Sequence, residues 1–300
     1  MGLHPGEAAA QRRMGVTRDG WGSAGVAAEI PPVAAEFLSG QRLLVLGSAD
    51  DGGAMWADAV VGPPGFATPV GTRSIAVDRR PALLAPLFAA GTREIGMLAI
   101  EPPTRRRMRV NGTASGTGDG LLIRTEQVYA NCPKYIQTRE FVDTVDGRGP
   151  GAARTGRTLT SAQREWIERS DTFFIATHAA GQGADVSHRG GNPGFVRAAG
   201  ADRLVWPEYV GNSMYMTLGN LELDPACGLL FIDWEKGHTL HLTGRARVDW
   251  APDERAESLP GARQVIDFDV ERVVELPGAL PGSWEFGEYH RFNPKIVARG

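Results

Sequence analysis

The chain has 300 residues, 42% of them hydrophobic, which is enough for one large folded domain or two of ordinary size. Its 32 Lys and Arg residues against 35 Asp and Glu residues offer no electrostatic footprint for nucleic acid. We find no secretory pattern and no apolar run long enough to cross a bilayer, so we expect a cytoplasmic protein without membrane contact. Two cysteines, Cys132 and Cys227, are too few for a disulfide framework, and no histidine spacing indicates a metal site.

The second half of the chain repeats the first in order, spacing and residue class. The stretch Leu44–Ser48 corresponds to Phe173–Thr177, and without a gap the block Pro64–Phe66 recurs as Pro193–Phe195. Several collinear blocks are harder to attribute to chance than one. We therefore interpret the chain as two copies of one module.

Each copy is expected to begin with a short helix, at Pro32–Leu38 and at Ser161–Arg169, the second with Thr160 and Gln163 in capping-box spacing. Strands separated by Gly-rich turns follow in both copies, and Gln264–Leu276 is expected to be a late strand. Short strands with few helices favour barrels, which remove exposed strand edges. The sequence therefore predicts a mainly β fold with short helices and two tandem barrel modules.

The repeat divides the chain into four parts. We expect an N-terminal arm at 1–30, a first module at 31–142, a linker at 143–158 and a second module at 159–300. The linker is assigned because it is polar, rich in Gly and without periodicity.

The two copies differ where a binding site is expected. A module that keeps its site in one copy should be polar there and filled by bulk in the other. The second copy is the polar one at this place. Its residues Ser187, His188 and Arg189 align with Asp58, Ala59 and Val60 of the first copy. The first copy is therefore expected to have lost its site.

A second polar feature, Gly211–Ser213, precedes an apolar helical stretch of the second copy. Free N–H groups at a helix start, with Gly, Asn and Ser, suit a phosphate, and Arg189 on a neighbouring strand would add charge. The alternative is an ordinary capped turn, because these residues occur freely in turns.

Three segments of the second copy, 184–195, 209–221 and 224–233, resemble in order and spacing the pyridoxamine 5'-phosphate oxidase-like family of FMN-binding split barrels. The resemblance implies split-barrel modules and a homodimer with FMN across its interface. It places the phosphate at Asn212, Ser213 and Arg189. Met214 stands where the oxidases have a basic phosphate ligand, and Arg291 is the nearest counterpart of their substrate-binding arginine.

The same resemblance implies further cofactor-binding residues on two strands. Residues of the strand around His188 would run beside the isoalloxazine ring, and residues of the next strand would lie near the ring or the ribityl chain. The complete set is Ser187, His188, Arg189, Gly191, Trp206, Pro207, Asn212, Ser213, Met214 and Thr217.

The segment Gln127–Gln137 follows the last strand of the first copy and has no counterpart in the second. It brings together Cys132, Lys134 and Tyr135, a thiol, an amine and a phenol that would tune a flavin or react themselves. With His188 they are the catalytic candidates. The alternative is a helix beginning at Pro133, with tyrosines packing between the modules. The nearby run 105–107 of three arginines is expected to be a solvated charge run at a hairpin turn.

These observations lead to one functional hypothesis and its alternatives. We expect an FMN-dependent oxidoreductase acting on a small-molecule substrate or electron donor. The alternatives are a carrier or sensor that binds flavin, or binds haem through His188 or His241, and a reductase that uses the deazaflavin F420.

Overall fold

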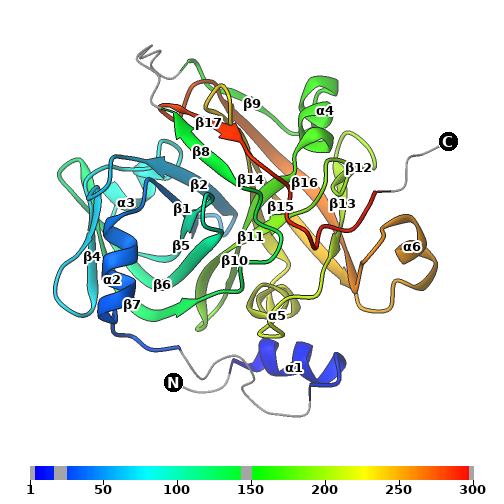
Figure 1. The fold of residues 1–300 in the computed structure, drawn as a ribbon, viewed down its shortest axis with the longest axis horizontal. Coiled ribbons are helices and arrows are strands. Elements are labelled where there is room, and N and C mark those ends of the chain that lie inside the picture. The colour runs from blue at the N-terminus through cyan, green and yellow to red at the C-terminus, as the bar shows by residue number, and fades with distance from the viewer. Residues whose placement is uncertain (1–3, 17–25, 143–150, 297–300) are drawn as a thin grey trace.

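A computed structural model describes residues 4–16, 26–142 and 151–296, which form two large sheets surrounded by short helices (Figure 1). The predicted mainly β fold with two split-barrel modules is confirmed. Every helix within these three ranges is too short or too polar to cross a membrane. The predicted arm and linker lie partly outside the described residues, at 1–3, 17–25 and 143–150.

The first sheet has seven strands in the order β2-β1-β5-β6-β7-β4-β3. All of its pairings are antiparallel. Its strands are β1 Leu43–Ala49, β2 Met55–Val61, β3 Ala67–Pro69, β4 Ser74–Val77, β5 Arg93–Glu101, β6 Arg106–Thr117 and β7 Gly120–Ala130.

The main path of the second sheet has the order β11-β10-β14-β15-β16-β13-β12. Its strands are β10 Thr172–Ala179, β11 Gly183–Gly190, β12 Arg197–Ala198, β13 Arg203–Glu208, β14 Ala226–Asp233, β15 His238–Asp249 and β16 Gln264–Leu276. Taken in chain order, each strand has the place of its counterpart in the first sheet. Even the register shift recurs, at Asn111/Gly112 and at Thr243/Gly244. A Cβ atom on either glycine would lie 2.0 Å from a carbonyl oxygen of the neighbouring strand, so both positions require Gly.

Two of the helices are those predicted. Helix α2 spans Pro32–Ser39 and α4 spans Ser161–Arg169. The Thr160 hydroxyl accepts a hydrogen bond from the Gln163 backbone N–H at 3.2 Å, while the Gln163 side chain accepts one from the Thr160 N–H at 3.0 Å. This reciprocal capping explains why α4 begins where the sequence indicated. The remaining helices are α1 Pro5–Arg13, α3 Ala85–Ala89, α5 Met216–Leu223 and α6 Asp253–Ser258.

The two sheets pack face to face through a shared apolar core. Buried side chains from both modules meet there, among them Val45, Ala57, Ala176, Val186 and Leu230. The contact is close enough that a Cβ atom on Gly47 would lie 2.6 Å from that of Ala176. Each module also has its own separate core. The modules therefore form one body, with an interior between them.

Smaller strands join the ends of the two modules. Strand β8, Arg139–Val142, pairs with β17, Ser283–Phe286, near the C-terminus. Strand β9, Arg154–Gly156, lies within the stretch assigned to the linker and pairs with β16. The chain thus crosses between modules more than once.

Candidate functional site

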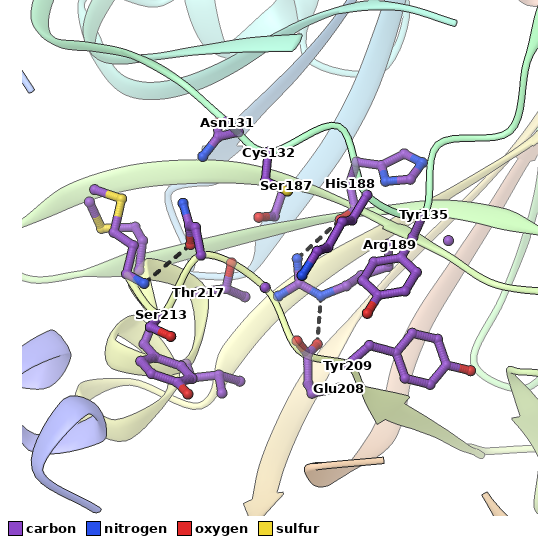
Figure 2. Close-up of a pocket in the computed structure, with 18 of the residues that line it drawn as sticks. Asn131, Cys132, Tyr135, Ser187, His188, Arg189, Glu208, Tyr209, Ser213 and Thr217 are labelled. Atoms are coloured by element: carbon purple, nitrogen blue, oxygen red, sulfur yellow. Dashed lines mark hydrogen bonds and ion pairs between the residues drawn. The ribbon is translucent and has the colours of Figure 1, made fainter. Parts of the chain in front are cut away.

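A pocket opens between the two modules, beside strand β11 and the turn that precedes α5 (Figure 2). Its cavity volume is about 110 Å³. The second module contributes β11, the end of β13 and the turn, while the first contributes β6 and the segment after β7. The pocket therefore depends on both modules of one chain.

Most of the residues singled out from the sequence line this pocket. They come from both halves of the chain and are Cys132, Lys134, Tyr135, Ser187, His188, Arg189, Pro207, Asn212, Ser213, Met214 and Thr217. Two residues of the expected cofactor set do not line it. Trp206 is fully buried in the core of the second module, with its indole N–H 3.3 Å from Glu208 Oε1. Gly191 packs closely against Phe195.

The segment after β7 is a turn, and the alternative of a helix beginning at Pro133 is wrong. Pairing with β6 extends strand β7 as far as Ala130, and Tyr135 takes a left-handed conformation with φ of 67° that a helix does not permit. The tyrosines do contact the second module. The hydroxyl of Tyr129 donates to Asp185 Oδ1, and that of Tyr135 donates to the Val210 carbonyl, each over 3.1 Å.

The interpretation of 105–107 as a solvated charge run is wrong for Arg107. Residues 102–105 make the turn, and Arg107 already belongs to β6. Because side chains alternate across a strand, Met108 enters the core of the first module while Arg107 and Arg109 both reach the pocket. Burial, together with the charges of Arg109 and Arg189, lowers the pKa of Arg107 to about 9.

Two of the pocket arginines are neutralised by carboxylates. Arg109 and Asp185 form a buried ion pair at 3.2 Å, and Arg109 also donates to the Ser187 hydroxyl. Arg189 Nε lies 2.5 Å from Glu208 Oε1, an ion pair visible in Figure 2. The arginine expected to bind phosphate is thus already held by an acid.

Two other pocket cations have no such partner. Among the described residues, no carboxylate forms an ion pair with Arg107 or Lys134. The buried Nε of Arg107 has no hydrogen-bond acceptor within the described part of the chain. The pocket therefore carries an excess of positive charge, which an anion would neutralise.

His188 is neutral, and its tautomer follows from its neighbour. Arg107 Nη1 lies 3.1 Å from His188 Nδ1, and because a guanidinium only donates, Nδ1 must accept. The proton then lies on Nε2, which is buried and has no acceptor among the described residues. Burial and then Arg107, ahead of other arginines, hold the pKa of His188 well below its usual value.

The turn that enters α5 has an unusual backbone. Ser213 and Tyr215 have φ values of 60° and 61°, a left-handed conformation that side chains disfavour by about 1–2 kcal/mol each. The Asn212 side chain accepts a hydrogen bond from the Met214 N–H at 3.2 Å. A Cβ atom on Gly211 would meet no atom within 4 Å, so the start of the turn borders open space.

The aligned region of the first module is closed by its own carboxylate. Asp58, at the position of Ser187, is 1% exposed. Its Oδ2 accepts from the backbone N–H groups of Leu83 and Leu84 at 2.6 and 3.2 Å, just ahead of α3. The nearby His241 has both ring nitrogens engaged, by the Ala57 carbonyl at 2.8 Å and the Thr239 hydroxyl at 2.7 Å. His241 is therefore not available as a haem ligand.

The donors of the pocket fit a phosphate monoester. Among the described residues, Arg107 has an orphaned buried Nε and Lys134 has no carboxylate partner, and open space borders Gly211. The cavity itself is smaller than the roughly 300–1,000 Å³ of a typical ligand site, so a larger ligand must extend out of it between the modules.

Sequence reasoning missed several residues of this site. Arg107, Arg109, Asn131, Glu208 and Tyr209 line the pocket but were not proposed. The alternation of Arg107 and Arg109 along one strand face was the available signal.

The fold and the site define a split-barrel protein with a cation-rich pocket between its two modules. The sequence model of the family described as pyridoxamine 5'-phosphate oxidase matches residues 159–276 of this chain. None of the curated proteins compared matches the chain.

Solved structures of similar proteins each cover less than half of the chain. HupZ of Group A Streptococcus is 16% identical with a TM-score of 0.32, over 38% of this chain and 92% of that one. A putative pyridoxamine 5'-phosphate oxidase from Lactobacillus delbrueckii is 17% identical with a TM-score of 0.32, over 39% and 93%. An FMN-binding protein from Syntrophomonas wolfei is 12% identical with a TM-score of 0.29, over 37% and 82%.

Proposed function

We propose that this chain is an FMN-binding flavoprotein and acts as a flavin-dependent oxidoreductase. Two findings support the proposal. Residues 159–276 match the sequence model of the pyridoxamine 5'-phosphate oxidase family, and the pocket at this module has the donors that a phosphate monoester requires.

The observation that carries the proposal is the pair of pocket cations without a carboxylate, Arg107 and Lys134. A phosphate monoester is close to dianionic at neutral pH, so it would neutralise both. Repulsion among Arg107, Arg109 and Arg189 disfavours the free pocket, and a bound anion would relieve it. Arg189 would contribute to the extent that it leaves Glu208.

When bound, the flavin would supply hydride transfer. The chain's own residues would bind the phosphate and hold the surrounding groups in place. His188 is neutral with its proton on Nε2, and it serves as a hydrogen-bond donor rather than a cation. Cys132 and Tyr135 line the first module's side of the pocket, so we propose that the small-molecule substrate or electron donor approaches there.

The test is the absorption spectrum of the purified protein, followed by titration of the apoprotein with FMN. We expect paired flavin bands and saturation at one FMN per chain, since Asp58 closes the aligned region of the first module. Absence of FMN binding would contradict the proposal. Bound flavin that no nicotinamide donor reduces would instead indicate a carrier or sensor, and a Soret band would indicate haem.

We also propose that the two modules arose by tandem duplication, with 31–142 and 159–300 as the copies. The identical strand order of the two sheets and the shared register shift support this.

The family resemblance implies a homodimer, and in this chain residues of both modules line the pocket. We propose that the two modules together make the site that two subunits would otherwise build. Light scattering during FMN titration tests this proposal. Binding that persists in a monomeric fraction supports it, and binding confined to a dimer contradicts it.

A further inference from the structure

Helix α1 lies against α5 of the second module, although it precedes the first module in the chain (Figure 1). The two helices touch through glycines. A Cβ atom on Gly6 would lie 2.0 Å from the Gly219 carbonyl oxygen, and one on Gly219 would lie 2.5 Å from the Glu7 backbone nitrogen. Neither position tolerates a side chain while the helices remain this close.

Polar contacts fix the angle of α1 on the second module. His4 Nδ1 accepts from the Glu7 N–H at 3.1 Å, so its Nε2 carries the proton and donates to Asn220 Oδ1 at 2.9 Å. Asn220 in turn donates to the Thr177 hydroxyl at 3.0 Å. At the other end of the helix, Arg13 forms an ion pair with Glu222 at 3.1 Å.

Gln11 connects this helix to the pocket. Its side-chain Nε2 lies 3.3 Å from the carbonyl oxygens of both Ser213 and Met214. These two peptide groups belong to the strained turn that contains the left-handed Ser213 and Tyr215. Gln11 is buried, so water does not compete for these hydrogen bonds.

The direction of the two peptide groups follows from trans geometry. In a trans peptide the carbonyl and the following N–H point opposite ways, and the described chain has no cis peptide. With both carbonyls turned toward Gln11, the N–H groups of Met214 and Tyr215 point away from α1. In Figure 2 the turn at Ser213 separates the blue helix from Ser187 and Arg189, and the Met214 N–H donates to the side chain of Asn212, which lines the pocket.

We propose that α1 clamps this turn in its binding conformation, and that Gln11 is the positioning residue. The proposal rests on the proposed function of the pocket as a phosphate site. It assigns a role to the N-terminal arm, which otherwise has none. Because linkage is reciprocal, a ligand that needs the clamped turn also strengthens the docking of α1.

The test compares two substitutions with a control on the same helix. Gln11→Ala removes both hydrogen bonds, and Gln11→Glu keeps the shape but puts an acceptor against two carbonyls. Arg12→Ala is the control, because Arg12 is exposed on the same helix. Amide hydrogen exchange of 211–217 in the protein without FMN, the thermal midpoint and FMN affinity are measured for each variant.

We expect faster exchange at 211–217 in both Gln11 variants with little change in the thermal midpoint. FMN affinity should fall roughly tenfold in Gln11→Ala and further in Gln11→Glu. Exchange at 211–217 that matches the wild type overturns the inference, whether or not FMN binds. If exchange rises as expected but the wild-type protein binds no FMN, the clamp stands and the proposed function fails.

Discussion

Arg107 of the first module donates to His188 of the second, with Nη1 and Nδ1 3.1 Å apart. This hydrogen bond joins the two halves of the pocket and fixes the imidazole tautomer. Arg107→Ala should weaken FMN binding by roughly 10-fold to 100-fold, because a charge-assisted contact to phosphate is lost. Flavin fluorescence titration measures the effect. Arg106→Ala is the matched control, since that neighbour is exposed and stacks over Phe37 outside the pocket.

Glu208 should oppose anion binding, because its carboxylate already holds Arg189 at 2.5 Å. Glu208→Gln would free the guanidinium and is expected to tighten FMN binding by up to about tenfold. Arg189→Ala should weaken FMN binding and also leave the buried Glu208 carboxylate without its ion-pair partner, lowering stability. Isothermal titration of both variants and the double variant measures the coupling. Weaker binding in Glu208→Gln would show that the carboxylate supports the ligand instead.

Asp58 should stabilise the first module without contributing to the pocket. Asp58→Asn weakens its hydrogen bonds to the Leu83 and Leu84 N–H groups, and we expect about 1–3 kcal/mol lower unfolding free energy. Denaturant unfolding measures the loss, and FMN titration should still saturate at one per chain. A second equivalent of bound FMN in this variant would show that the carboxylate charge, and not the filled space, excludes FMN from the first module.

The docking of α1 should depend on pH through Glu7. Burial, reinforced by Asp185 on β11 and opposed by Arg109 on β6, raises the pKa of Glu7 from 4.5 to about 8. A raised carboxyl pKa means that the docked helix holds this proton, so the contribution of Glu7 to docking is full below pH 4.5 and is lost as pH rises through about 8. His4 acts in the opposite direction, because burial lowers its pKa and protonation of its Nδ1 at low pH would end the hydrogen bond from the Glu7 N–H.

Hydrogen exchange of residues 5–13 across this range measures the effect. Glu7→Gln mimics the protonated acid and should abolish the loss of docking as pH rises through about 8. A wild-type profile that is equally flat would contradict the assignment.

Cys132 should react with a thiol reagent far faster than Cys227. Cys132 is partly exposed at the pocket, whereas Cys227 is fully buried and burial raises the pKa of its thiol. Bound FMN should slow the reaction at Cys132. Mass spectrometry of labelled peptides distinguishes the two sites, and equal rates would end the case for a reactive Cys132.

Local signals predicted the elements of this fold well. The helix Ser161–Arg169 was found from its capping box, and β16 has the bounds expected from the pattern of Gln264–Leu276. In both cases the information lies within the segment itself.

The arrangement of the whole site could not be predicted from the sequence, because it depends on contacts between residues far apart in the chain. Gln11 and Ser213 are 202 positions apart, and nothing near either residue encodes their contact. The alternation of β6 shows that Arg107 and Arg109 share a face, but only the packing of the two modules determines that this face meets His188. The ion pair between Glu208 and Arg189 likewise depends on how the strands pack, and because of it Arg189 is not a free phosphate ligand as expected.

The shared core between the sheets also changes how the molecule can evolve. In an assembly of two identical chains, each substitution appears on both sides of the symmetry axis, so neither site can change alone. Joining the halves in one polypeptide removes that restriction. One side holds the acid Asp58 where the other has Ser187, and Arg107 is free to serve a single site. Two modules in one chain can therefore differ from each other, whereas the two halves of a twofold dimer of identical chains cannot.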